Sequence, residues 1–462
     1  MIDLSIFEGR TVAVLGLGRT GLSAAAALMR SRAQVWAWDD DAAARDAGAR
    51  SGIPLVDLTR CDWSTPNAMV LSPGIPHTHP RPHPAVALAR DAGCAIIGDI
   101  ELLVRTQRGA TFIGVTGTNG KSTTTALLGH ILKAAGRPTQ VGGNIGVPVL
   151  ELQPSAPGGI FVLEMSSYQL ELAPSLSFDV AVLLNISADH LEHHGGMAGY
   201  VAAKTLVFRG QAAGATAVVG IDDEPSHAIF EKLRETGEQI VVPISSGRRA
   251  TGGIHVANGE LRDDSAAENT VVLDLRPLAH LPGSHNWQNA AAAFAAARAV
   301  GVPHHAIASG IRSFPGLSHR QELVATIDGV TYVNDSKATN PDAAAKALAC
   351  YDTIYWIAGG RAKEGGLEAI EPYLGRVRHA FLIGEAADSF ATALAGKVTM
   401  SKPGTLEAAV AEAQALARRH DSRDAVVLLS PACASFDQFD NFEARGDAFR
   451  DLVDALPGQR GG

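Results

Sequence analysis

A glycine-rich segment in the first third of the chain has the residue types of a phosphate-binding loop. Residues 112–115 are apolar and predict a buried strand, and apolar residues at helical spacing predict a helix after Ser122. The turn between them carries Lys121 just before that serine. In such loops, backbone N–H groups and the helix N-terminus bind phosphates, a lysine adds positive charge and a hydroxyl contacts Mg²⁺. The segment therefore predicts a nucleoside triphosphate site; the alternative is an ordinary strand–helix turn with a solvated lysine.

One position of this segment departs from the common pattern G-x-x-x-x-G-K-[ST]. The first glycine of that pattern falls at position 115, which is Val115, while Gly114 and Gly117 flank it. We therefore expect the turn to be built differently from the common phosphate loop.

A second glycine turn lies near the N-terminus. Residues 11–15 predict a strand, Gly16-Leu-Gly18-Arg-Thr-Gly21 follows, and residues 34–38 predict a second strand that ends in Asp39. This is the dinucleotide-binding fingerprint, with an acid placed for a ribose or base edge. It predicts a phosphate-bearing ligand, such as NAD or a UDP-sugar, at the helix N-terminus. A purely structural glycine turn is the alternative.

Polar residues follow several predicted strands of the central region. Glu164 ends the apolar run 160–163, where a Mg²⁺ ligand is needed beside a phosphate loop. Asp189 and His190 follow the predicted strand 180–184 and are candidates for the same site. Lys204 lies on a predicted helix, where spacing alone favours an ordinary surface lysine.

Two other histidine-rich stretches are better interpreted as solvated loops. The run 76–84 alternates histidine and proline, and its prolines prevent a helical metal-binding face. His193 and His194 lie close to Glu192, but their spacing fits no standard zinc site. Cys433 invites a catalytic-thiol interpretation, yet no base is identifiable beside it, so we expect a packed thiol.

Composition restricts the class of protein. The chain has 462 residues, 46% of them hydrophobic, with 48 glycines, which suits α/β domains with tight turns. The net charge of −9 makes a nucleic-acid partner unexpected. The four cysteines form no C-x-x-C pair and indicate free thiols in a reducing cytosol. No apolar run reaches 18 residues, so we expect a cytoplasmic protein without a membrane segment.

Five central motifs together resemble the Mur ligases, the ATP-dependent amide-forming enzymes of peptidoglycan synthesis, which are related to folylpolyglutamate synthase. They are Gly117-Thr-Asn-Gly-Lys-Ser122, Gly143-Asn-Ile-Gly146, Leu163-Glu-Met-Ser-Ser-Tyr-Gln-Leu170, Asn185-Ile-Ser-Ala-Asp-His190 and Ala202-Ala-Lys204. In that family the phosphate loop has the form Gly-Thr/Ser-Asn-Gly-Lys-Ser/Thr, so the departure at position 115 belongs to the family pattern. The resemblance spans essentially the whole chain.

The resemblance implies two Mg²⁺ ions. Ser122 and Glu164 would ligate the first, and His190 would help to hold the second. Lys204 matches a lysine that the family carries as a carbamate, an anion that supports the second ion; this implication reverses the surface-lysine interpretation. The catalytic residues implied are thus Lys121, Glu164, His190 and Lys204.

Motifs of the last third resemble the branch of the family that adds D-glutamate to UDP-N-acetylmuramoyl-L-alanine. These motifs are Asn334-Asp-Ser-Lys-Ala-Thr-Asn340 and Ser430-Pro-Ala-Cys-Ala-Ser435, and the Asp-Asn-Pro-Arg motif of the diaminopimelate- or lysine-adding branch is absent from the sequence. The ATP-binding residues implied are Gly117, Thr118, Asn119, Gly120, Lys121, Ser122, Thr123, Asn289, Arg320, Asp335 and Lys337. The substrate-binding residues implied are Gly18, Arg19, Thr20, Asp39, Gly74 and Asn144 for the UDP substrate and Thr339, Lys363, Ser435 and Phe442 for D-glutamate.

Two departures from the family pattern affect these implied contacts. Asp40 and Asp41 follow Asp39, where some relatives have a basic residue near the uracil, and the segment 359–366 around Lys363 is unusually rich in glycine.

The expected fold is α/β with three domains. Residues 1–99 form a Rossmann-like domain for the UDP substrate, 100–315 a P-loop ATPase-type parallel sheet, and 316–462 a Rossmann-like domain that binds the amino acid and closes over ATP. We expect a monomer without a nucleic-acid or membrane partner. An NAD-dependent oxidoreductase and a nucleotide-gated binding protein remain as alternatives, although the first leaves the central phosphate loop unused.

Overall fold

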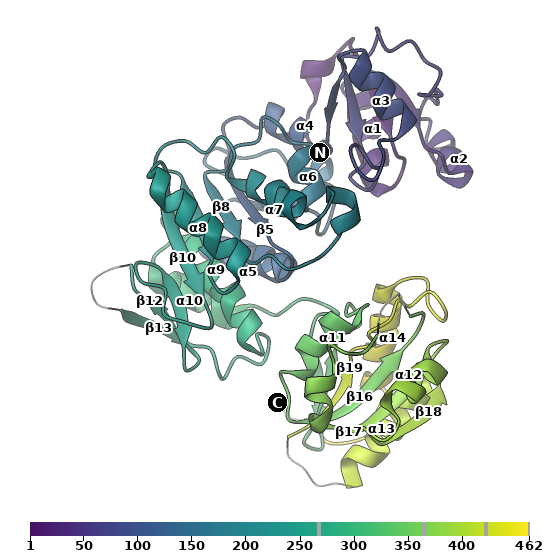
Figure 1. The fold of residues 1–462 in the computed structure, drawn as a ribbon, viewed down its shortest axis with the longest axis vertical. Coiled ribbons are helices and arrows are strands. Elements are labelled where there is room, and N and C mark those ends of the chain that lie inside the picture. The colour runs from purple at the N-terminus through teal and green to yellow at the C-terminus, as the bar shows by residue number, and fades with distance from the viewer. Residues whose placement is uncertain (266–268, 363–365, 420–423, 461–462) are drawn as a thin grey trace. The chain divides into compact units, whose positions relative to one another are not determined.

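The computed structural model describes residues 1–265, 269–362, 366–419 and 424–460 and divides them into two compact units (Figure 1). The first unit comprises residues 1–275 and 286–314, and the second comprises 276–285 and 315–462. The first unit contains two β-sheets and the second contains one.

The N-terminal sheet has four parallel strands in the order β2-β1-β3-β4. Alternate residues of β1 face opposite sides. Val12 and Val14 pack in a core with α1, whereas Ala13 and Leu15 pack in a core with α3. Helices therefore cover both faces, as a parallel sheet requires. The elements are β1 (Thr11–Leu15), α1 (Arg19–Arg30), β2 (Gln34–Trp38), α2 (Ala42–Arg50), β3 (Ala68–Leu71), α3 (Pro84–Asp91), β4 (Ala95–Ile97) and α4 (Asp99–Thr106).

The turn from β1 to α1 requires its glycines. Gly16 has φ +95, in the region that favours glycine. A Cβ on Gly21 would lie 1.8 Å from the carbonyl oxygen of Gly16. Backbone conformation at Gly16 and the close packing of α1 on the turn at Gly21 thus explain these two glycines, and no ligand is needed to explain them.

The central sheet has nine strands in the order β13-β12-β11-β10-β9-β8-β5-β7-β6. Its strands are parallel from β6 to β11, and β12 and β13 add an antiparallel edge. The strands are β5 (Thr111–Thr116), β6 (Thr139–Gly143), β7 (Ile160–Glu164), β8 (Val180–Leu183), β9 (Thr216–Gly220), β10 (Ile240–Ser245), β11 (Ile254–Ala257), β12 (Glu260–Asp263) and β13 (Thr270–Asp274). The helices are α5 (Lys121–Ala134), α6 (Ser167–Glu171), α7 (Met197–Thr205), α8 (Glu224–Thr236), α9 (Ser284–Ala299) and α10 (His304–Ser313).

The third sheet has six strands in the order β14-β15-β19-β16-β17-β18, and only the β14–β15 pair is antiparallel. Trp356 of β16 packs in a core with α11 and α12, and its neighbour Tyr355 packs in a core with α13 and α14. The elements are β14 (Glu322–Ile327), β15 (Val330–Asn334), α11 (Pro341–Leu348), β16 (Thr353–Gly359), β17 (Val377–Ile383), α12 (Ala387–Leu394), β18 (Met400–Gly404), α13 (Leu406–Arg419), β19 (Ala425–Leu429) and α14 (Phe442–Asp454).

The expected α/β class with predominantly parallel sheets is confirmed. The predicted strands 11–15 and 34–38 match β1 and β2, and the predicted strand 180–184 ends one residue earlier, at Leu183 of β8. The three domain ranges stay a prediction.

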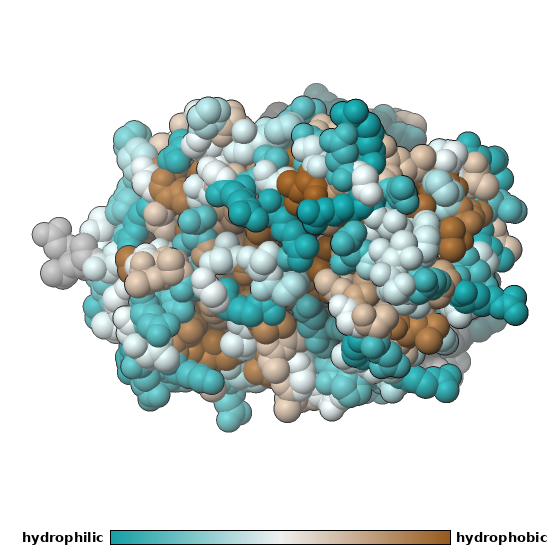
Figure 2. Space-filling view, turned by 90° about the horizontal axis from the view of Figure 1, so that it is seen from above, coloured by the Kyte–Doolittle hydropathy of each residue, from teal (hydrophilic) through white to brown (hydrophobic). Residues whose placement is uncertain are grey.

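The surface is mixed in character. On the face shown in Figure 2, hydrophilic and hydrophobic residues are interspersed. The most exposed large hydrophobic side chains, Phe436 and Ile240, lie far apart in the sequence. Within the described part of the chain, we find no helix with the length and hydrophobicity to cross a bilayer.

Asp99, at the start of α4, is a buried acid outside the predicted site. Its side chain is 3% exposed, and its Oδ1 accepts a hydrogen bond from the amide of Ile100. Burial raises the pKa of Asp99 to about 6. In the unfolded chain, the pKa of an aspartate carboxyl is about 3.9. Between about pH 4 and pH 6, Asp99 is therefore mostly protonated in the folded state and mostly ionised in the unfolded chain. The stability from this protonation is complete below about pH 4 and is lost as the pH rises through about 6.

We therefore expect Asp99→Asn to stabilise the first unit above neutral pH. The uncharged asparagine side chain removes the cost of burying a charge, which is on the order of 3 kcal/mol for a pKa shift of about two units. Its carbonyl oxygen can still accept the hydrogen bond from the backbone N–H of Ile100. Denaturant unfolding at pH 4 and pH 7.5 measures the effect. The variant should gain about 1–3 kcal/mol at pH 7.5 and little at pH 4; equal changes at both pH values would contradict this explanation.

Candidate active site

The central glycine loop joins β5 to α5 at the carboxyl edge of the sheet. Val115 is fully buried within β5, so the loop itself starts at Gly117, and this explains why the first glycine is displaced. Gly114 has a packing role, because a Cβ there would lie 2.3 Å from the ring of Phe178. Gly120 has φ +83, and a Cβ on it would lie 2.1 Å from Oδ1 of Asn289. Gly120 and Asn289, which the family resemblance implies in ATP binding, therefore lie next to each other.

Two lysines converge on one carbonyl oxygen of this loop. Nζ of Lys121 donates to the carbonyl oxygens of Gly117 and Thr118, each at 2.9 Å. Nζ of Lys204 donates to the same Gly117 oxygen at 2.8 Å. The helix α7 therefore delivers Lys204 to the phosphate loop, although the two lysines are far apart in sequence.

Lys204 is buried, so the surface-lysine interpretation drawn from spacing was wrong. Its side chain is 2% exposed, and Nζ lies 4.6 Å from the centre of the Tyr200 ring. Burial, followed by the nearby charge of Lys121, lowers the pKa of Lys204 to about 7, while Asp189 acts in the opposite direction. A large fraction of this lysine is then a neutral amine near neutral pH.

Glu164 presents a carboxylate oxygen without a partner at the same sheet edge. The residue ends β7 and is 2% exposed. Its Oε1 accepts a hydrogen bond from Nδ2 of Asn144 at 3.0 Å, whereas its buried Oε2 has no hydrogen-bond partner. An orphaned buried carboxylate oxygen beside a phosphate loop fits a hard cation such as Mg²⁺. Asn144, implied to contact substrate, is here the residue that orients this carboxylate.

His190 lies in a strained turn after β8. Its φ is +49, which is unfavourable for a residue other than glycine, and its side chain is 55% exposed and 3.6 Å from Asp189. Among the described residues, no three histidine, cysteine or acidic side chains are grouped to hold a metal ion.

Asn185 clamps the phosphate loop and was assigned no role from the sequence. Its side chain pairs with both backbone groups of Asn119, accepting from N at 2.9 Å and donating to O at 3.2 Å. Its backbone carbonyl accepts from the amide of Thr118. The signal that could have found it is its position directly after β8, the strand beside β5.

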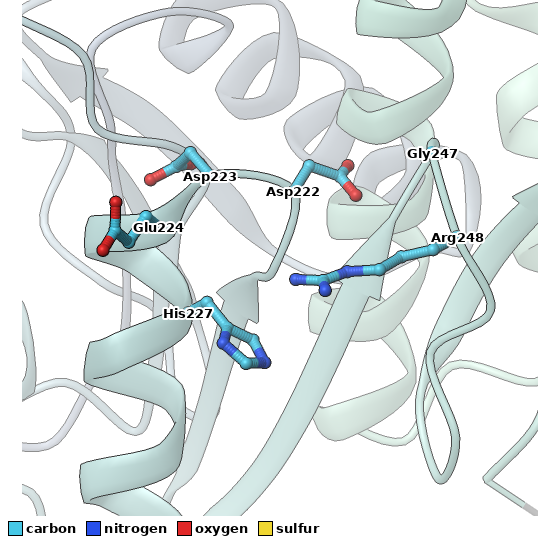
Figure 3. Close-up of a pocket in the computed structure, with 6 residues that line it drawn as sticks. All are labelled: Asp222, Asp223, Glu224, His227, Gly247 and Arg248. Atoms are coloured by element: carbon cyan, nitrogen blue, oxygen red, sulfur yellow. The ribbon is translucent and has the colours of Figure 1, made fainter.

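A chain of hydrogen bonds continues from this clamp to an open cavity. Nδ2 of Asn185 donates to Gln288, and Gln288 donates to Asp222. Asp222 lines a cavity of about 460 Å³ at the carboxyl ends of β9 and β10, where the Arg248 side chain extends towards Asp222 and His227 (Figure 3). Asp222 also accepts hydrogen bonds from Ser245 and Ser246, so its main contacts are structural.

The N-terminal glycine turn is held largely by its own residues. Asp39, implied to contact uracil or diphosphate, accepts hydrogen bonds from the amides of Leu17 at 2.6 Å and Asp41 at 2.9 Å. The Arg19 side chain donates to the carbonyl of Gly146, in the turn after β6. Of the other implied residues, Gly18 and Gly74 are exposed and Thr20 is half-buried.

In the second unit, the structure brings several implied residues together. Nζ of Lys337 lies 3.6 Å from the centre of the Phe442 ring. Asp335 is buried and accepts from Oγ of Ser430 at 2.8 Å, and burial raises the pKa of Asp335 to about 7. Ser435 is buried, Thr339 is half-buried and Arg320 is exposed. Lys363 lies outside the described residues.

Other sequence interpretations have mixed outcomes. Cys433 is fully buried, and burial raises the pKa of its thiol to about 12, which confirms a packed thiol. The solvated-loop prediction was wrong for His194, which is 6% exposed, and for the largely buried His77. His83 accepts from the amide of Ala85 and caps α3, so the histidine–proline run ends in a helix.

Comparison with known proteins identifies the class. Residues 115–297 match the family description "Mur ligase middle domain", and residues 319–433 match "Mur ligase, glutamate ligase domain". The crystal structure of UDP-N-acetylmuramate-alanine ligase MurC from Thermotoga maritima aligns with a TM-score of 0.58 at 16% identity, covering 96% of this chain and 99% of that one. At that identity the alignment supports the fold alone. The chain belongs to the Mur ligase family, as its motifs indicated.

Within the family, the most similar relatives carry one name. A protein of Rhodospirillum rubrum is 53% identical over 459 residues, covering 98% of this chain and 96% of the relative. A protein of Paramagnetospirillum magneticum is 51% identical over 457 residues, covering 99% of both. Both are called UDP-N-acetylmuramoylalanine--D-glutamate ligase.

The position of Gly120 gives a test of the loop geometry. We expect Gly120→Ala to weaken nucleotide binding at least about tenfold, because it combines left-handed strain with a clash on Asn289. Gly136→Ala is the matched control, since Gly136 has φ +74 at the far end of α5 and a Cβ added there would have nothing within 4 Å. Calorimetric titration with ATP measures both. Similar losses in the two variants would mean that strain alone, and not the packing on Asn289, limits position 120.

Proposed function

We propose that this chain joins D-glutamate to UDP-N-acetylmuramoyl-L-alanine by an amide bond, with conversion of ATP to ADP and phosphate. The observation that carries the proposal is the convergence of Lys121, Lys204 and the orphaned Glu164 carboxylate on one phosphate loop. The names of the two relatives supply the substrates. We further propose that the reaction occurs in the cytoplasm, on a monomer, as a step in peptidoglycan precursor synthesis.

The proposed reaction proceeds in two steps. First, a carboxylate oxygen of the L-alanine residue attacks the γ-phosphorus of ATP, so that a C–O–P bond forms, the β,γ-bridging bond breaks and ADP leaves. The amine of D-glutamate then attacks the acyl carbon, and the acyl–oxygen bond breaks to release inorganic phosphate. The amine loses its proton in this second step.

The loop residues stabilise charge during phosphoryl transfer. Lys121 would exchange its contacts with the Gly117 and Thr118 carbonyls for phosphate oxygens. The loop amides of residues 117–123 would bind the β- and γ-phosphates at the N-terminus of α5. Asn289 would lie near the adenine, and Arg320, Asp335 and Lys337 would bind the nucleotide from the third domain.

Two Mg²⁺ ions would be held by Ser122, Glu164, His190 and a carbamylated Lys204. Mg²⁺ held by these residues would neutralise the negative charge that develops on the transferred phosphoryl group. An unmodified lysine amine offers no oxygen ligand to Mg²⁺, whereas a carbamate supplies anionic oxygens. Addition of CO₂ forms an N–C bond and requires a neutral amine, which is the state that the burial of Lys204 favours.

The two substrates would bind through residues from different parts of the chain. Gly18, Arg19, Thr20, Asp39 and Gly74 would hold the UDP group, and Asn144 would adjoin the reacting carboxylate. Residues proposed around D-glutamate are Thr339, Lys363, Ser435 and Phe442. Closure of the third domain would then bring the amine to the activated carboxylate.

Amino-acid-dependent phosphate release tests the reaction. With ATP, Mg²⁺ and UDP-N-acetylmuramoyl-L-alanine, we expect release with D-glutamate and at least about 100-fold less with L-glutamate, diaminopimelate or L-alanine. Lys121→Ala should lower turnover by at least about 1,000-fold, and the exposed Lys133→Ala on the same helix should retain it. Ligand binding without phosphate release would instead indicate a nucleotide-gated binding protein.

A second experiment addresses Lys204. We expect Lys204→Ala to lose turnover by at least about 100-fold and to regain part of it with added acetate or formate, whose carboxylates replace the carbamate oxygens. Carbon-13 NMR of the wild-type protein in labelled bicarbonate should show a carbamate signal that Lys204→Ala lacks. Unaltered activity in the variant would refute any role for this lysine.

A further inference from the structure

The two histidine-rich segments assigned to solvent from the sequence meet in the structure. The 3₁₀ turn η3 (Leu191–His194) follows His190 and lies against the loop of residues 76–79. A Cβ on Gly195 would come within 3.0 Å of Nε2 of His79. The cavity between the segments is only about 10 Å³ and is lined by His77, His79, Tyr168 and His193, among others. The contact is therefore closely packed.

Tyr168, on the short helix α6, is the centre of this contact. Its ring meets the rings of His190 and His193 edge-on, with centroids 5.7 and 5.6 Å away and interplanar angles of 62° and 88°. It stacks on His194 at 5.1 Å and 25°. One aromatic ring thus contacts three histidines of a single turn in the geometries that aromatic pairs prefer.

Two further residues of α6 lie against the same turn at His194, and one of them, Ser167, is within hydrogen-bonding distance of it. Oγ of Ser167 and Nε2 of His194 are 2.9 Å apart. Glu171 lies three residues after Tyr168, on the same side of the helix, with Oε1 3.7 Å from Nδ1 of His194 and Oε2 3.5 Å from Nε2 of His77. The turn is thus held at His194 as well as at His190.

The helix that makes these contacts is itself fixed to the phosphate loop strand. The amide of Met165 donates to the carbonyl of Val115, and Thr116 donates to the carbonyl of Met165. Ser166 and Gln169 form a capping box at the helix start. The side chains of α6 therefore have a defined position relative to Glu164 and the phosphate loop.

His190 needs such support. Its left-handed backbone conformation is unfavourable, and its side chain is 55% exposed, so the turn gains little from its own burial at this residue. We propose that Tyr168 is a positioning residue that holds His190 in the orientation required for the divalent cation, through contact of its ring with the histidine turn. The inference rests on the proposed function, because that function makes His190 a metal-binding residue.

Direct measurement of metal binding tests the proposal without relying on turnover. Mn²⁺ binding is followed by electron paramagnetic resonance in the presence of a non-hydrolysable ATP analogue. We expect Tyr168→Leu to weaken Mn²⁺ binding about tenfold, and Tyr168→Phe, which keeps the ring, to stay within about twofold of the wild type. Tyr373→Leu, which shortens a half-buried tyrosine in the other unit, is the matched control and should bind as the wild type does.

His190→Ala separates the outcomes. If His190→Ala weakens Mn²⁺ binding and Tyr168→Leu does not, the positioning role is overturned while the metal assignment of His190 stands. If His190→Ala has no effect on Mn²⁺ binding, the metal assignment of His190 and the positioning role of Tyr168 are both wrong. The proposed reaction is still tested separately, by D-glutamate-dependent phosphate release. Tyr168→Leu in the His190→Ala background should cause no further loss, and a further loss would contradict action through His190. Tyr168→Met, which lacks the ring, replaces Tyr168→Leu if that variant does not fold.

Discussion

The carbonyl oxygen of Gly117 accepts hydrogen bonds from two lysines, and the candidate site is built around this interaction. Burying a second amine beside Lys121 is unfavourable when both are charged, and the resulting fall in the pKa of Lys204 is the physical consequence. The burial that disfavours the charged ammonium form of Lys204 favours its neutral amine, which is the form that can react with CO₂. A solvent-exposed lysine at position 204 would have neither the lowered pKa nor the neutral amine.

The topology of the central sheet decides which residues can reach this oxygen. Because β5 lies between β7 and β8, the carboxyl ends of these strands meet at one edge. The phosphate loop and Asn185 follow β5 and β8, and Glu164 ends β7, so residues such as Asn119 and Asn185, which are 66 positions apart, become neighbours. This is why one glutamate can present an oxygen beside the loop while one asparagine clamps the loop backbone.

Several candidate residues, within one unit or the other, are held at an energetic cost that the packing around them offsets. Glu164 has an unpartnered buried oxygen, Asp335 is buried with a raised pKa, and His190 has a left-handed backbone. By contrast, the glycines at 16, 21 and 114 serve close packing, so a glycine-rich pattern alone does not separate ligand contact from structure. Asp39 is a further example, because its carboxylate accepts hydrogen bonds from the backbone amides of Leu17, in the glycine turn, and of Asp41.

The sequence alone determined the α/β class, the phosphate loop and the family, because these depend on local patterns: apolar runs, glycine spacing and a few contiguous motifs. It could not show that Lys204 is buried on Gly117, since a helical position does not reveal which face another element covers. Nor could it show that His77, Tyr168 and His194 meet, because each lies in a different segment and polar loops are ordinarily solvated. Those contacts arise only when parallel strands bring distant loops to one edge, and tertiary structure alone decides them.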